Sequence, residues 1–301
     1  MSQYLFDLST DSTADLVPGF AEKNGIWTVP LSFNIEKDGA FTSCRDNFKT
    51  EEEYAAFYQK LREGAYSRTA MLNLNDHLEH FYKLAKAGVK DVVHFTISYG
   101  LSPTVDVANQ AAETVQKEYP DFHVYAVESR SATVGQGILV KMALKMRNEG
   151  KTAKETFDFV NEAKFRLQHL IVANDLYYLK RGGRVSGASA LIGTMLSIKP
   201  YIVMDGDGKL NVEEKFHGMK KAFSFIADEV KRLGVDDGHY VVIVHTDAKD
   251  KAEELAAKVK EVVGFDPEIQ IMGPVIGSHV GPGAVACGFL SKTPRVPSEN
   301  K

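Results

Sequence analysis

The first candidate for chemistry is Ser98, in the segment FTISYGLSPT at residues 95–104. It follows an apolar run typical of a buried strand and precedes a predicted helix, and open α/β sheets bind ligands beyond the carboxyl ends of their strands. The hydrolase elbow Gly-x-Ser-x-Gly is incomplete, because Thr96 takes the place of its first glycine. Ser98, Asp247 and His279 nevertheless occur in a serine-hydrolase order. Three interpretations stay open: a turn-stabilising hydroxyl, a ligand contact or a nucleophile.

His279 is the second candidate, in GSHVGPGAV at residues 277–285. Three glycines and a proline surround it, so we expect its imidazole on a loop. Histidine titrates near neutral pH and can donate to an anion, although a structural hydrogen bond is the alternative. No second histidine or carboxylate lies at metal-ligand spacing, so no metal is expected.

The third candidate is the basic loop LKRGGRVSG at residues 179–187, which places Lys180, Arg181 and Arg184 around two glycines. Such a loop can bind phosphate through backbone amides, but it lacks the endings of a P-loop or dinucleotide motif. A charged, exposed turn explains it equally well. We expect a helix to follow, at LIGTML, residues 191–196.

Three other polar segments have structural explanations. Ser102 followed by Pro103 predicts a helix cap with proline in the first turn. DSTADL, residues 11–16, also fits a helix cap, and DGDGKL, residues 205–210, fits a hairpin turn.

The elements that must position these residues alternate between strand and helix, which predicts an α/β fold. Thr50 to Glu53 and Thr152 to Glu155 have the capping-box spacing of helix starts. With 301 residues, two α/β domains are expected, at 1–167 and 168–301. Short apolar runs predict the strands at 4–8, 26–35, 91–97, 122–127, 170–174, 201–204, 240–245 and 268–272.

Composition excludes several classes of protein. Hydrophobic residues make up 44% of the chain and charged residues 25%, so an ordered fold is expected. A net charge of −4 without a dense basic run argues against nucleic acid. The start MSQYLFDLST lacks a signal or membrane-span pattern, which predicts a cytoplasmic protein. Cys44 and Cys287 are far apart and are expected to be reduced thiols.

Five segments resemble, in order, the DegV family of bacterial fatty-acid-binding proteins: DSTADL, ISYGLSPT, DLYYLKRGGRVSG, SIKPYIVMDGDGKL and GPVIGSHVGPGAV. The resemblance implies two DegV-like α/β domains with a long-chain fatty acid between them, its tail in an apolar tunnel. It further implies a non-catalytic subunit that presents the carboxylate to an ATP-dependent fatty acid kinase for acyl-phosphate formation, without a cofactor. A transient encounter with membranes is compatible with that task.

The same resemblance assigns the ligand contacts. Ser98 and His279 match the family's carboxylate-binding serine and histidine, and Thr69 matches its third hydroxyl. Ala70 stands where the family has a serine, and Tyr99 replaces the serine beside Ser98. These departures predict a head-group shell of different shape.

The kinase contact is expected at Arg181 and Arg184, and at His217, which stands near a position where the family commonly has arginine. Because of His217, a lipid-binding regulatory protein without a kinase remains an alternative. A serine hydrolase that uses Ser98 and His279 is the other.

Overall fold

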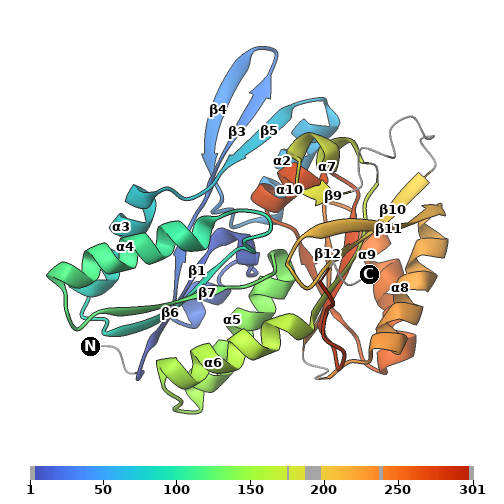
Figure 1. The fold of residues 1–301 in the computed structure, drawn as a ribbon. Coiled ribbons are helices and arrows are strands. Elements are labelled where there is room, and N and C mark those ends of the chain that lie inside the picture. The colour runs from blue at the N-terminus through green and yellow to red at the C-terminus, as the bar shows by residue number, and fades with distance from the viewer. Residues whose placement is uncertain (1–3, 175, 187–197, 237–239, 298–301) are drawn as a thin grey trace.

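The computed structural model describes residues 4–174, 176–186, 198–236 and 240–297 (Figure 1). Its strands are β1 Asp7–Asp11, β2 Ile26–Val29, β3 Ser32–Lys37, β4 Ala40–Arg45, β5 Tyr66–Ala70, β6 Asp91–Thr96, β7 His123–Glu128, β8 Leu167–Val172, β9 Val185–Ser186, β10 Ile198–Met204, β11 Leu210–His217, β12 Val241–His245, β13 Glu268–Ile271 and β14 Val285–Leu290. Its helices are α1 Phe20–Lys23, α2 Glu51–Arg62, α3 Leu74–Lys86, α4 Thr104–Glu118, α5 Thr133–Asn148, α6 Ala153–Ala163, α7 Tyr177–Gly182, α8 Met219–Leu233, α9 Lys249–Val263 and α10 Pro274–Val280, with 3-10 turns η1 Ser12–Ala14 and η2 Lys164–Arg166.

Three sheets form the framework. A parallel four-stranded sheet has the order β2-β1-β6-β7, and an antiparallel three-stranded sheet has the order β4-β3-β5. A mixed seven-stranded sheet has the order β13-β12-β14-β8-β10-β11-β9. The parallel pairing of β1, β6 and β7 brings their carboxyl ends to one edge, where the loops that follow them meet the second half of the chain.

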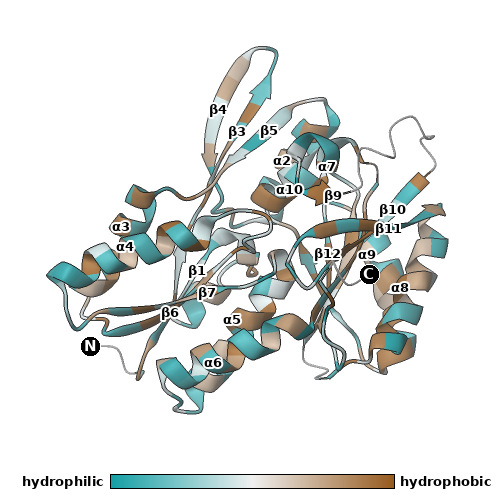
Figure 2. Cartoon of the chain, viewed as in Figure 1, coloured by the Kyte–Doolittle hydropathy of each residue, from teal (hydrophilic) through white to brown (hydrophobic). Residues whose placement is uncertain are grey.

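Helices cover the sheets in layers (Figure 1). Helices α3 and α4 pack on one face of the four-stranded sheet and α5 and α6 on the other, while α8 and α9 cover the outer face of the seven-stranded sheet. The largest hydrophobic cluster runs from β1 and β6 through α5 to β8 and β14. Figure 2 shows why the core lies between these layers: the central strands are mostly hydrophobic, and the outer helices alternate between hydrophobic and hydrophilic residues.

The predicted α/β class is confirmed. Both capping boxes form, at Thr50 and Thr152, and the hairpin turn at residues 205–209 joins the antiparallel strands β10 and β11. The predicted strand at 26–35 is two strands, because the chain leaves one sheet at Pro30 and enters another.

The predicted cap at Ser102 is wrong. Pro103 is the N-cap residue of α4 and makes no side-chain cap, while the Ser102 hydroxyl is hydrogen-bonded to the Thr104 hydroxyl at 2.9 Å. The Ser102 hydroxyl therefore pairs with another side chain, and not with a backbone amide of the helix as the sequence pattern predicts.

All strands of the two smaller sheets precede residue 129, and all strands of the seven-stranded sheet follow residue 166. The hydrophobic core is nevertheless continuous between these halves, through α5. The domain division at 167/168 therefore stays a prediction. Within the described ranges, no helix is both long and apolar enough to cross a membrane.

Candidate functional site

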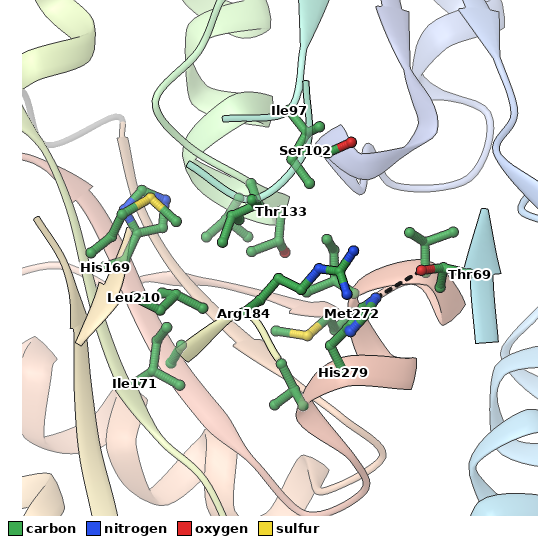
Figure 3. A pocket seen from close by; sticks show the side chains of 18 of the residues that line it. Thr69, Ile97, Ser102, Thr133, His169, Ile171, Arg184, Leu210, Met272 and His279 are labelled. Carbon is green, nitrogen blue, oxygen red and sulfur yellow. Dashed lines mark hydrogen bonds between the residues drawn. The ribbon is translucent and has the colours of Figure 1, made fainter. Parts of the chain in front are cut away.

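A cavity of about 320 Å³ lies between the two halves of the chain (Figure 3). Its wall is mainly apolar and combines the loop after β6, the start of α5, and strands β8 and β14 with α10. The polar or charged side chains in its wall are few: Thr69, Ser102, Thr133, His169, Arg184 and His279. A mostly apolar cavity of this size with a few polar groups has the character of a small-molecule site.

The cavity contains one hydrogen-bonded polar pair, Thr69 and His279, which comes from opposite halves of the chain. Thr69 Oγ1 and His279 Nε2 are 2.8 Å apart (Figure 3). A second contact of the same kind, Ser67 Oγ to Ser278 Oγ at 2.6 Å, connects the same strand and helix. Strand β5 and helix α10 are thus held together at two successive points, and this fixes the geometry of the pair.

His279 lies on helix α10 and not on a loop, so that prediction is wrong. Pro274 begins the helix at its first turn, where a missing N–H costs nothing, and Gly281 follows its end. The glycines around His279 instead permit close packing: a Cβ atom at Gly277 would collide with Tyr58, and one at Gly182 with His279 Nδ1. A short helix therefore replaces the expected turn.

The His279 imidazole is neutral at physiological pH. Burial, together with the positive charges of Arg184 and Arg181, lowers its pKa to about 4. Nδ1 has no hydrogen-bond partner. When Nε2 carries the ring hydrogen, it donates to Thr69 Oγ1 and leaves the Thr69 hydroxyl hydrogen free for a ligand.

Arg181 and Arg184 both lie beside this pair. Arg181 stacks on Tyr66, with its guanidinium carbon 3.7 Å from the ring centroid, and Arg184 lines the cavity and donates to the Gly182 carbonyl at 2.5 Å. His217 is exposed at the end of β11 and does not line the cavity. The predicted helix at 191–196 lies outside the described residues.

Ser98 is not brought to the cavity wall. Its side chain is fully buried, and its hydroxyl donates to the Gly208 carbonyl at 2.8 Å and accepts from the Gly100 amide at 3.2 Å. Ser102, four residues further along the chain, lines the cavity instead. The Ser98 hydroxyl thus connects the end of β6 to the β10–β11 turn, and its direct contact with a ligand stays a prediction.

Ala70, which follows Thr69, and Tyr99, which follows Ser98, differ in their access to the cavity. Ala70 lines it, whereas the side chain of Tyr99 is 54% exposed and is not part of its wall. The Tyr99 amide donates to Glu128 Oε1 at 2.7 Å, and this bond helps to hold the loop after β6 in place. Met71 and Leu101 also line the cavity.

Asp11 does more than the helix cap that its sequence predicts. It caps η1 through the Thr13 amide, and it also accepts from the Ile97 amide at 2.9 Å and from Gln136 Nε2 at 2.9 Å. One buried carboxylate therefore holds three segments, and Ile97 and the start of α5 both belong to the cavity wall. Burial raises the pKa of Asp11 although these donors favour its charged form.

The predicted hydrolase triad is not assembled. Ser98 donates to Gly208, His279 is bonded to Thr69, and Asp247 forms an ion pair with Arg62. No described group of three or more histidine, cysteine or acidic side chains has an arrangement that could hold a metal ion. Both cysteines are free, and Cys287 lies in the cavity wall, where burial raises its pKa to about 12.

The sequence patterns did not single out His169, which lies in β8 and lines the cavity. All six residues of β8 are buried, so the strand has no polar face that would set His169 apart. In the structure, His169 and Ile171 share one face of β8, and both line the cavity.

Layered α/β halves with a mostly apolar cavity between them are typical of proteins that bind a largely hydrophobic small molecule. The model of the DegV family matches residues 6–292, and the chain belongs to that family. A DegV domain-containing protein of Clostridium perfringens is 36% identical over 96% of this chain and 98% of its own length.

Solved structures share the fold over nearly their whole length. The DegV lipid-binding protein of Thermotoga maritima has a TM-score of 0.82 at 27% identity and covers 96% of this chain and 99% of its own. A fatty-acid-binding DegV family protein of Streptococcus agalactiae has a TM-score of 0.80 at 30% identity, with the same coverage. The two-domain α/β arrangement expected from the sequence agrees with these neighbours.

Proposed function

We propose that this protein binds a long-chain fatty acid in the cavity and presents its carboxylate, in the cytoplasm, to an ATP-dependent fatty acid kinase. The observation that carries the proposal is the 320 Å³ apolar cavity with the Thr69–His279 pair in its wall. Relatives described as fatty-acid-binding support the class of ligand.

The apolar wall would supply most of the affinity, and the Thr69–His279 pair would orient the ligand. Each buried CH₂ group contributes about 0.8 kcal/mol, so a sixteen-carbon tail represents a gross transfer free energy on the order of 12 kcal/mol. A hydrogen bond to a charged group contributes about 1.5 to 3 kcal/mol. Much of the larger figure is offset by the ordering of the chain and by association.

The head group would lie at the Thr69 hydroxyl, with Arg184 nearby at the surface. Neutral His279 orients that hydroxyl without adding a charge, so the carboxylate is held by modest donors and stays available for reaction. The protein itself supplies no catalytic group in this proposal. Arg181, Arg184 and His217 form the proposed contact with the kinase.

Two measurements test this proposal. Fatty acid extracted from the purified protein should be identified by mass spectrometry, and Thr69→Val should lower its occupancy while Thr42→Val, an exposed change in the same small sheet, should not. Equal occupancy in both variants would reject the head-group assignment. Full lipid binding without acyl-phosphate formation by any fatty acid kinase would favour a regulatory lipid-binding protein.

A further inference from the structure

A second polar group lies in the same cavity, away from the Thr69–His279 pair. His169 lines the wall from β8 and is 3% exposed, and neither ring nitrogen has a partner with good hydrogen-bond geometry, although the Ala132 backbone lies close to the ring. Figure 3 shows His169 on the opposite side of the cavity from Thr69 and His279. A buried polar group without a partner costs free energy, so its place in a ligand cavity requires an explanation.

The ring is held firmly in this position. A Cβ atom at Gly135 would collide with His169 Nε2, which shows that the imidazole packs directly on the backbone of α5. The buried Ser131 hydroxyl lies 2.9 Å from that same Cβ position and also has no partner. Two unpaired polar side chains therefore lie close together at the start of α5.

The imidazole is neutral in this environment, since burial and the charge of Arg295 lower the pKa of His169 to about 3 against the opposing effect of the Ala132 backbone. A neutral imidazole has one N–H donor and one acceptor nitrogen. A hydroxyl group both donates and accepts, so it can pair with an accessible imidazole nitrogen in either tautomer. A saturated hydrocarbon chain can do neither, and a second carboxylate would bring an unpaired charge into the cavity.

Burial alone does not distinguish His169 from other histidines of the protein. His77 is also fully buried with both ring nitrogens unpaired, but it packs against Phe81 and His94 beneath α3 and lines no part of the cavity. His169 differs from it by facing the space that the ligand would fill. His77 therefore serves as a matched control.

We propose that His169 is a specificity-determining residue and that the preferred ligand is a hydroxylated long-chain fatty acid whose chain hydroxyl pairs with this imidazole. This inference rests on the proposed fatty-acid function and refines its substrate class. A ligand hydroxyl in this position would give the imidazole a well-formed hydrogen bond, and an unsubstituted acid would not.

The test compares stearic acid with its monohydroxylated isomers on the full-length protein. At least one isomer should bind about tenfold more tightly than stearic acid, because a site with unpaired polar groups discriminates against a ligand that cannot satisfy them. His169→Leu should abolish that preference and bind stearic acid at least as well as the wild type. His77→Leu should leave the preference unchanged.

His169→Phe keeps a planar ring and serves as a second variant if His169→Leu fails to fold. The inference is overturned if no isomer exceeds stearic acid in the wild type, or if the preference persists without the imidazole. Neither result affects the proposed function, which fails separately if stearic acid and all of its hydroxylated forms do not bind.

Discussion

Gly182 is the position where one methyl group should disable the head-group site without unfolding the protein. A Cβ atom there would fall well inside the ordinary contact distance of 3.4 Å from His279 Nδ1. The imidazole is the movable partner, so Gly182→Ala should displace it and break the 2.8 Å bond between Nε2 and Thr69 Oγ1. Gly182 ends α7, where alanine is not disfavoured, so the free energy of unfolding should not fall.

The expected loss is one head-group hydrogen bond, about 1.5 to 3 kcal/mol. This corresponds to a Kd for palmitate about 10- to 150-fold higher, measured by displacement of a fluorescent fatty acid. Lys180→Ala, an exposed change in the same helix, provides the control. In a His279→Ala background, Gly182→Ala should cause no further loss. Additive losses, or an unchanged Kd in the single variant, would refute the mechanism.

Three further predictions concern stability and loop position. Burial lowers the pKa of His77 to about 4, whereas its ordinary value is 6.5, so between these values the unfolded state binds more protons than the folded state. The free energy of unfolding should therefore fall by about 1.4 kcal/mol per pH unit as the pH drops from 6.5 towards 4. Urea unfolding of His77→Phe should show a smaller decrease per pH unit than the wild type. Asp11→Ala leaves the Ile97 amide and other buried donors without their acceptor and should lower the free energy of unfolding by about 3 kcal/mol or more in the same assay; a loss below 1 kcal/mol would contradict its role. Ser98→Ala removes the bond to Gly208 and should speed hydrogen exchange in the β10–β11 turn, whereas an effect on palmitate affinity alone would indicate direct ligand contact.

Features encoded locally were predictable from the sequence. The capping boxes at Thr50 and Thr152 depend on residues three positions apart, and both form. The α/β class followed from alternating apolar runs and amphipathic helices. Strand β4 was missed because five of its six residues are exposed, so no apolar run identifies it.

The site could be predicted only in part, because its geometry depends on contacts between distant residues. The bond between Thr69 and His279 joins positions 210 residues apart, and the motif resemblance alone suggested that pair. Ser98 and Ser102 both follow β6, and the Gly208 carbonyl, 110 residues away, binds one of them. His169 lies in a strand buried on both faces, so the sequence does not reveal which face meets the cavity.

Fatty-acid binding in the cavity is tested most directly by a crystal structure of the protein with a bound long-chain fatty acid. Electron density for the acyl chain is expected along the apolar wall, with one carboxylate oxygen about 2.7 Å from Thr69 Oγ1. A reversed ligand with its carboxylate at His169, or a cavity that stays empty at saturating fatty acid, would contradict this expectation.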